Sequence, residues 1–266
     1  MTDKQIEILS PIFTNLAIWK ERYLSKFNKS NNTILSNFEN YNHIKTKQTI
    51  GLMDCLLTDF ILEKDKIKGL NKTQSVLFNP LSFFPIGETM HSFLIANIIN
   101  PNSEHGQGDL FLKSLLKKLD IEVYENDNWI VTAEIGRIDI LIKRENPHTV
   151  IVIENKSNYA IDQENQIYRY WYQEIYLPNK KQLKPISEEN YHIIYLTPSE
   201  YKIPEKHSLL RPKEYDENLP EIVPLKPKIW QFDKEIKDWL KNSINELHSE
   251  NHRLREYIKQ YIELWN

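Results

Sequence analysis

Apolar residues recur at helical spacing through the first part of the chain. Over residues 5–27 most of them fall three or four positions apart, and Pro11 suits the first turn of a helix. A second run with the same spacing covers residues 46–64, whereas the Asn- and Ser-rich stretch 30–42 predicts a loop or a short turn. Residues 1–80 are therefore expected to form a helical annex, in which packing is the simplest role for the apolar stripes.

A different pattern begins near residue 81. Three short runs rich in β-branched and apolar residues predict β-strands, and the brief connections between them, at Gly136 and at residues 145–148, fit consecutive antiparallel pairing. The order of helix and strand patterns predicts a mixed α/β domain over residues 81–266 that ends in helices. The predicted helices cover residues 87–100, 109–120 and 163–177, and the predicted strands cover 129–135, 137–144, 149–157, 191–197 and the strand-like piece 226–232.

The composition describes a folded chain and excludes several classes of protein. Hydrophobic residues make up 40% of the chain, and 34 Lys and Arg against 37 Asp and Glu give a net charge of −3. Intrinsic disorder is therefore excluded, and so is a bulk electrostatic attraction to nucleic acid. The single cysteine, Cys55, excludes an intramolecular disulfide and is interpreted as a small buried residue. The sequence has no secretory signal and no apolar run of membrane-spanning length, which predicts a cytoplasmic protein without a membrane partner.

Candidate chemistry lies on two neighbouring predicted strands. Side chains alternate between the faces of a strand, so Asp139 lies on the face opposite the isoleucines of its strand, and Glu154 shares a face with Lys156. If the two strands form a hairpin with Arg144 opposite Thr149, Asp139 falls opposite Glu154. Two carboxylates beside an ammonium favour a hard cation such as Mg²⁺, with the lysine placed to hold a water or a phosphate oxygen.

A structural alternative is an ion pair between Glu154 and Lys156 on a surface hairpin, which is a common arrangement. Glu88, near the start of the helix predicted over residues 87–100, favours a functional site instead, because it supplies a further acid shortly before the sheet. The helix dipole also stabilises an acid at this position, so the structural alternative stays open for Glu88.

Two further segments carry polar patterns. The helix predicted over residues 163–177 has a polar stripe that faces either a phosphate or base, or bulk water; beside it runs an apolar stripe that is expected to face the core. The glycine loop at residues 105–109 contains His105, whose expected role is structural, and Asp109, which is an expected N-cap. The polar stripe consists of Gln163, Gln166, Tyr170 and Gln173.

The order of these motifs resembles the PD-(D/E)XK nuclease superfamily, and in particular its branch of bacterial PD-(D/E)XK-like proteins. The resemblance covers about residues 84–240, and it departs from the nominal motif at Ile138, where proline is usual but the position varies widely. The blocks that carry it are Glu88 in ETMHS, the run HGQGDLFL, Asp139 in GRIDILI, Glu154 and Lys156 in IENK, and Gln166 with Tyr170 in QIYRY.

The resemblance implies a restriction-endonuclease-like core, in which a central four-stranded mixed sheet is flanked by helices. It also implies cleavage of phosphodiester bonds with Mg²⁺ or Mn²⁺ as the cofactor. In this interpretation Asp139 and Glu154 are metal-binding carboxylates, and the carbonyl of Asn155 is a candidate third ligand.

The remaining site residues follow from the same resemblance. Lys156 would orient or activate the attacking water, and Glu88 would correspond to the helix acid of the superfamily. Gln166 and Tyr170 match the Q-x-x-x-Y element of the RecB-like nucleases, which helps to position the substrate.

The expected partner is therefore nucleic acid, with DNA as the favoured substrate, and the distribution of the family implies bacterial defence, mobile-element or repair roles. The alternative is a non-catalytic regulatory member of the same fold that binds nucleic acid or a protein. The intact set of Asp139, Glu154 and Lys156 favours the enzyme. The net charge of −3 favours the alternative, because a free nuclease usually presents a basic face. A protein partner or a homodimer that assists substrate binding therefore stays among the expectations.

Overall fold

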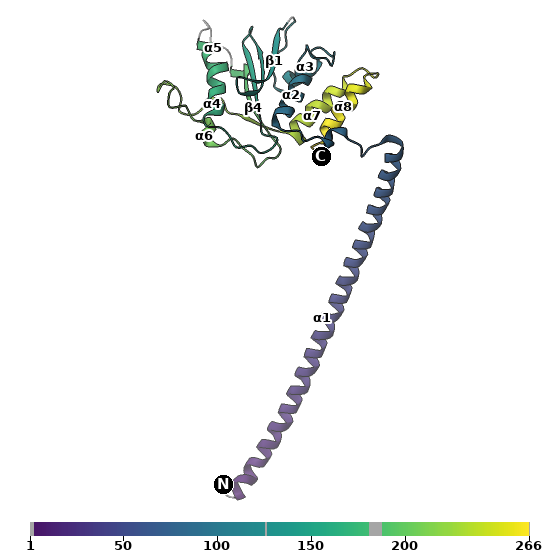
Figure 1. Ribbon diagram of the computed structural model, residues 1–266. Coiled ribbons are helices and arrows are strands. Elements are labelled where there is room, and N and C mark those ends of the chain that lie inside the picture. The colour runs from purple at the N-terminus through teal and green to yellow at the C-terminus, as the bar shows by residue number, and fades with distance from the viewer. Residues whose placement is uncertain (1–2, 126, 181–187, 266) are drawn as a thin grey trace. The chain divides into compact units, whose positions relative to one another are not determined.

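The computed structural model describes residues 3–125, 127–180 and 188–265, and the chain divides into two compact units between Phe78 and Asn79. In the first unit a single helix, α1, extends over Asp3–Gln74 (Figure 1). The loop predicted at residues 30–42 is therefore wrong. This stretch contains neither Gly nor Pro, its apolar residues keep the helical spacing, and the Thr33 hydroxyl donates a hydrogen bond to a carbonyl one turn earlier, so nothing in it ends a helix.

The side chains of α1 are exposed from Thr14 to Leu70. Cys55 is among them, so its interpretation as a buried residue is wrong. Helical spacing predicts which residues share a face of a helix, but it does not predict that another element covers that face. Neither α1 nor any other helix of the described residues combines the length and the hydropathy that a membrane span needs.

The second unit is built around one mixed sheet of five strands in the order β1-β2-β3-β4-β5. The first three strands are antiparallel neighbours, whereas β4 runs parallel to both β3 and β5. The expected α/β class and mixed sheet are confirmed, but the expected number of four strands is wrong, because the short strand β5 extends the sheet beyond β4. The strands are β1 Trp129–Ile135, β2 Ile138–Arg144, β3 Thr149–Asn155, β4 Tyr191–Thr197 and β5 Lys228–Gln231.

The hairpin of β2 and β3 has the predicted register. Arg144 pairs with Thr149 beside the turn, and Ile140 pairs with Ile153 farther along. The pairing fixes which residues oppose each other over the whole hairpin, because a slip by one residue would turn the buried isoleucines to the opposite face.

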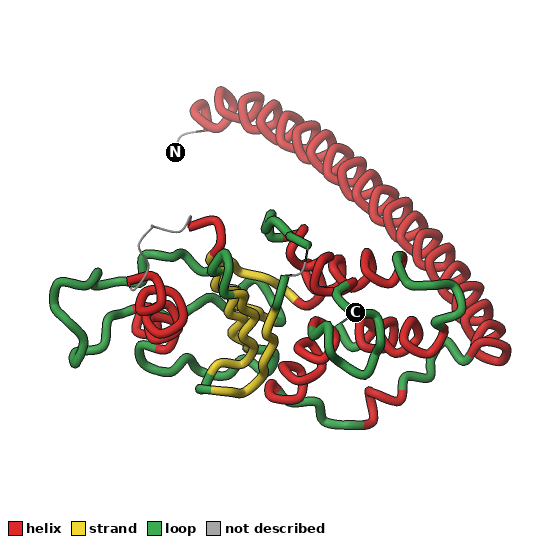
Figure 2. The backbone as a smooth tube through the Cα atoms, turned by 90° about the horizontal axis from the view of Figure 1, so that it is seen from above, coloured by secondary structure: helices red, strands yellow, loops and turns green. Residues whose placement is uncertain are grey.

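Helices cover both faces of the sheet (Figures 1 and 2). On one face lie the helices that precede the sheet and those that end the chain. On the other face lies α4, which continues through a π-helical turn, Trp171–Tyr176, into α5. The helices of the first face are α2 Glu88–Ile99, α3 Leu110–Lys118, α7 Lys237–Asn245 and α8 His252–Glu263; those of the second are α4 Gln166–Tyr170 and α5 Leu177–Lys180, and the short α6 Lys206–Leu209 contacts α4.

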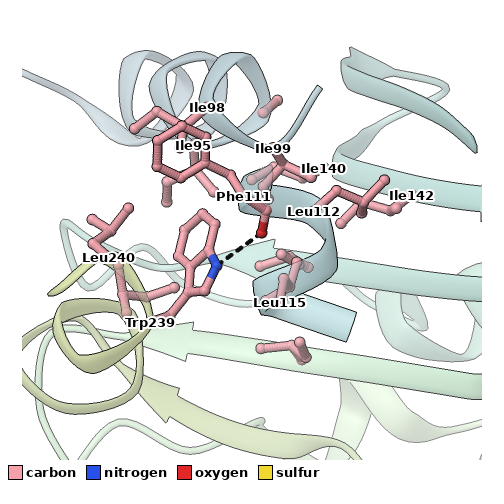
Figure 3. Packing of buried hydrophobic residues seen from close by; sticks show 14 of the residues in the cluster. Ile95, Ile98, Ile99, Phe111, Leu112, Leu115, Ile140, Ile142, Trp239 and Leu240 are labelled. Carbon is pink, nitrogen blue, oxygen red and sulfur yellow. Dashed lines mark hydrogen bonds between the residues drawn. The ribbon is translucent and has the colours of Figure 1, made fainter. Parts of the chain in front are cut away.

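The main hydrophobic core lies between the sheet and α2, α3, α7 and α8. Figure 3 shows Trp239 of α7 packed beside Phe111 of α3, and its indole Nε1 donates a hydrogen bond to the Phe111 carbonyl at 3.1 Å. Ile140 and Ile142 of β2 reach the same core. Because burial of each such side chain stabilises the fold by about 1.5–3 kcal/mol, this face holds β2 and β3 rigidly. Their other face, toward α4, carries a second hydrophobic cluster that includes Leu141, Val150 and Val152, and Glu154 lies on this side at the end of β3.

Candidate active site

Glu154 lies on the α4 side of the sheet, and Asp139 reaches it at the end of β3. Strict alternation does not hold at the start of β2, because Ile138, expected on the opposite face with the other isoleucines, packs in the α4-side cluster. Lys143 of β2 forms an ion pair at 3.4 Å with Glu174, in the π-helical turn that follows α4. Glu154 contacts α4 directly, because its Oε2 lies 2.8 Å from the Tyr170 hydroxyl. Asp139 Oδ2 accepts a hydrogen bond at 2.6 Å from the backbone N–H of Asn155, the residue after Glu154. The two acids therefore meet at the end of the hairpin that lies away from its turn.

Lys156 follows β3 immediately and completes this cluster. Its Nζ lies 2.7 Å from Glu154 Oε1 and 3.4 Å from Gln166 Oε1. The side chain of Lys156 is only 5% exposed and that of Glu154 only 2%. The ion pair is therefore buried, unlike the surface pair of the structural alternative.

Gln166 and Tyr170, one turn apart on α4, hold the other oxygen of Glu154. Gln166 Nε2 donates a hydrogen bond to the Tyr170 hydroxyl at 2.8 Å, and that hydroxyl lies 2.8 Å from Glu154 Oε2 and 2.7 Å from the carbonyl of Arg137. Both side chains are buried. They therefore belong to the acid cluster and not to a solvated helix face.

The other two glutamines of the predicted polar stripe behave differently. Gln163 and Gln173 are exposed. The helix begins only at Gln166, because Asn165 before it takes a left-handed conformation with φ of 56°. Helical spacing therefore does not apply to Gln163, which lies outside the helix, and the prediction of one continuous stripe is wrong.

Burial raises the pKa values of both acids, and for Asp139 the charge of Glu154 adds to this effect. Burial, and after it the carboxylate of Glu154, raise the pKa of Asp139 to about 8, although the N–H of Asn155 opposes the shift. Burial also raises the pKa of Glu154, against the opposing effects of Lys156 and Tyr170. Near neutral pH, Asp139 therefore holds a proton in the protein without a cation.

Burial and neighbouring charge act in opposite directions on the pKa of Lys156. Burial lowers the pKa of its ammonium, but the carboxylates of Glu154, Asp162 and Asp139 outweigh burial and leave the pKa above its ordinary value. Lys156 is thus held as a cation inside the cluster.

Glu88 and Asn155 link the cluster to α2. Glu88, the first residue of α2, accepts hydrogen bonds through Oε1 from the backbone N–H groups of Asn158 and Ala160, at 3.0 and 3.3 Å. The Asn155 side chain donates to the Glu88 carbonyl at 2.8 Å on the α2 face of the sheet. Glu88 therefore holds the loop after Lys156. The side chain of Asn155 is engaged with α2, so only its backbone carbonyl is available to a cation between the two acids.

The histidines of the motif blocks in α2 and in the glycine loop pack against core residues, His91 against Phe232 and His105 against Phe111. His91 Nδ1 lies 2.9 Å from the Tyr261 hydroxyl, and burial lowers the pKa of His91 to about 4, so it is neutral. His105 Nε2 lies 3.1 Å from the Asn100 carbonyl, as its expected structural role requires. Asp109 precedes α3 as expected, but its carboxylate pairs with Lys113 at 2.8 Å and does not cap the helix.

Asp162 is a buried acid of the cluster that the sequence analysis missed. Its Oδ1 lies 3.5 Å from Lys156 Nζ and accepts a hydrogen bond from the Tyr195 hydroxyl at 2.6 Å. Tyr195 itself was the available signal, because a tyrosine within a buried strand needs a partner for its hydroxyl. No local pattern, however, identifies that partner.

The donor set fits a hard divalent cation. Asp139 is partly buried and Glu154 is buried. Their raised pKa values reflect loss of solvent and, for Asp139, the nearby Glu154 carboxylate, a cost that a cation between them would relieve. Within the described ranges, no group of three or more His, Cys, Asp or Glu side chains is arranged to hold a metal ion. A cation here would therefore rely on two carboxylates, a backbone carbonyl and water. This set suits Mg²⁺, which usually keeps several waters, better than Zn²⁺.

Comparison with known proteins gives one match. The model of a family described as the PD-(D/E)XK nuclease superfamily matches residues 78–263, which is more than half of the chain. Neither the curated proteins nor the solved structures compared with the chain gave a match.

Proposed function

Because the chain belongs to the PD-(D/E)XK nuclease superfamily, we propose that it is a metal-dependent nuclease that hydrolyses phosphodiester bonds in DNA. The observation that carries the proposal is the pair of acids on adjacent strands, the partly buried Asp139 and the buried Glu154, with the Lys156 ammonium 2.7 Å from Glu154. These residues belong to the second unit, so we propose that residues 79–266 carry the activity.

Asp139, Glu154 and the backbone carbonyl of Asn155 would hold Mg²⁺ or Mn²⁺. When bound, such a cation supplies a hydroxide nucleophile near neutral pH and stabilises the negative charge that develops on the phosphoryl oxygens. The carboxyl group of Asp139 gives up its proton to take part, because only the carboxylate is a ligand.

The neighbouring side chains orient these groups. Lys156 adds a point charge next to the acids, where it can hold a water or a phosphate oxygen. Tyr170 and Gln166 fix the carboxylate of Glu154 through a chain of hydrogen bonds at 2.8 Å each. Glu88 contributes indirectly, since it fixes the loop that follows Lys156. We therefore propose Glu88 as a positioning residue.

A cleavage assay with several substrates tests the proposal. Purified protein should cut plasmid or linear duplex DNA with Mg²⁺ or Mn²⁺, and EDTA should abolish the cutting. Single-stranded DNA and RNA belong in the same assay, because cleavage of RNA alone would contradict DNA as the substrate. Cleavage that persists in EDTA would contradict the metal requirement. Binding of DNA without any cleavage would favour the non-catalytic, regulatory alternative.

The residues of α4 should have smaller effects. Tyr170→Phe and Gln166→Ala should each lower kcat/KM by about tenfold, the scale of groups that orient a metal ligand, because each removes a hydrogen bond from the chain that holds Glu154. The exposed Gln173→Ala, on the helix that continues α4, is the matched control and should behave as wild type. If all three variants cleave the preferred substrate equally well, the hydrogen-bond chain has no part in the activity.

A further inference from the structure

Asp162 joins three separate segments around the active site. It lies in the loop between β3 and α4, and its side chain is only 1% exposed. Its Oδ1 accepts a hydrogen bond from the Tyr195 hydroxyl of β4, and its Oδ2 accepts one from the backbone N–H of Glu205 at 2.7 Å. Asp162 therefore satisfies two groups from outside its own loop while its Oδ1 also faces Lys156.

The ammonium of Lys156 lies among three acceptors. Glu154 Oε1 is at 2.7 Å, Gln166 Oε1 at 3.4 Å and Asp162 Oδ1 at 3.5 Å. An ammonium has three N–H donors, so these acceptors match its capacity. Two of the three carry negative charge.

The carboxylates of Glu154 and Asp162 have different roles in the proposed reaction. Glu154 is a metal ligand there, and a cation that binds it competes with Lys156 for its charge. Asp162 then remains as the charged partner of Lys156. Without it, a buried ammonium would face the cation with only Gln166 to hold it, and like charges repel.

We infer that Asp162 is a positioning residue that keeps the Lys156 ammonium in place beside the metal ligands during turnover. The inference rests on the proposed nuclease function. Asp162 acts through Lys156 and does not itself contact the substrate or the cation.

Asp162→Asn separates this role from a purely structural one. An asparagine can accept the Glu205 N–H with Oδ1 and donate to the Tyr195 hydroxyl with Nδ2, so it can keep both structural hydrogen bonds. It removes the negative charge that faces Lys156 at 3.5 Å and Lys202 at 3.9 Å. Glu205→Gln is the matched control, because it removes a carboxylate from the segment that Asp162 binds, and that carboxylate pairs with Lys202.

The expected kinetic result is a fall in kcat of about 10- to 100-fold for Asp162→Asn, with KM and Mn²⁺ affinity unchanged within roughly twofold. Glu205→Gln should keep the wild-type kcat. An unchanged kcat for Asp162→Asn, or an equal loss in both variants, would overturn the inference.

A second readout does not require activity. Acetylation of the metal-free protein with acetic anhydride, followed by mass spectrometry, should label Lys156 several times faster in Asp162→Asn than in wild type, because the ammonium loses a charged partner. Lys113, which pairs with Asp109 on α3, should be labelled at the same rate in both. Unchanged labelling of Lys156 would overturn the inference even if the protein cleaved nothing, so failure of the nuclease proposal and failure of this inference give different results.

Discussion

Asp139→Asn should abolish both cleavage and divalent-cation binding while the protein stays folded. Asparagine removes the charge that a cation needs, yet its Oδ1 can still accept the hydrogen bond that Asp139 takes from the N–H of Asn155 at 2.6 Å. We expect turnover to fall by about a thousandfold or more, the scale of losing electrostatic stabilisation in an active site.

The same substitution should stabilise the protein in the absence of metal. Between the ordinary value of 3.8 and the raised pKa of about 8, folded Asp139 keeps a proton that the unfolded chain has released. The wild-type free energy of unfolding therefore falls as the pH rises through this window and levels off above it. Asp139→Asn has no such proton, so it should gain stability over wild type with rising pH, on the order of a few kcal/mol by pH 9.

Urea unfolding in EDTA at pH 5 and pH 9 measures this difference. The exposed Asp109→Asn on the surface of the same unit is the control, and its difference from wild type should not grow with pH in this way. If Asp139→Asn were no more stable than wild type at pH 9, the two acids would not be strained by burial and repulsion.

Lys156→Met should also remove most of the activity, but it should keep metal binding. Methionine fills a similar volume without the ammonium, so the acids remain while the charge directed at the water or phosphate is lost. A loss in kcat of about 10²- to 10⁴-fold is expected, as for other groups that assist proton transfer or stabilise charge.

This substitution should lower the stability of the metal-free protein, because it leaves the buried Glu154 without its partner at 2.7 Å. Breaking a buried pair in this way costs about 3–5 kcal/mol. Addition of Mn²⁺ should therefore raise the melting temperature of Lys156→Met more than that of wild type. Lys143→Met, which breaks the half-exposed pair on the same face of β2, is the control. A variant that lost Mn²⁺ binding along with activity would mean that Lys156 mainly holds the site together.

The hairpin and its acids could be predicted from the sequence because they depend on local rules. Period-two alternation and a four-residue connection predict the β2–β3 register. Continued by one residue beyond the pair of Ile140 and Ile153, this register places Asp139 opposite Glu154. The identity of the residues that surround these acids depends on tertiary packing instead. Nothing in the sequence distinguishes the buried Gln166 from the exposed Gln163. The helix begins between them, after the left-handed Asn165, whose backbone N–H donates a hydrogen bond to the distant His207 carbonyl.

The missed residue Asp162 depends on long-range contacts. Asp162 is linked to Tyr195 of β4 and to Glu205, both more than 30 residues away, and no local pattern predicts such a partner. The wrong loop at residues 30–42 of α1 has a local cause instead. Asn and Ser favour loops, but their preference against a helix is only a few tenths of a kcal/mol per residue. This is too small to end a helix in a stretch without Gly or Pro.

The central claim is that Asp139 and Glu154 form a divalent-cation site, and calorimetric titration with Mn²⁺ tests it most directly. Wild-type protein at pH 7 should bind Mn²⁺ and release close to one proton, measured in buffers of different ionisation enthalpy, because Asp139 must lose the proton that it holds below about pH 8. Asp139→Asn should show no binding, and Asp109→Asn should titrate as wild type. Mn²⁺ binding by Asp139→Asn with wild-type affinity and without a change in proton release would contradict the claim.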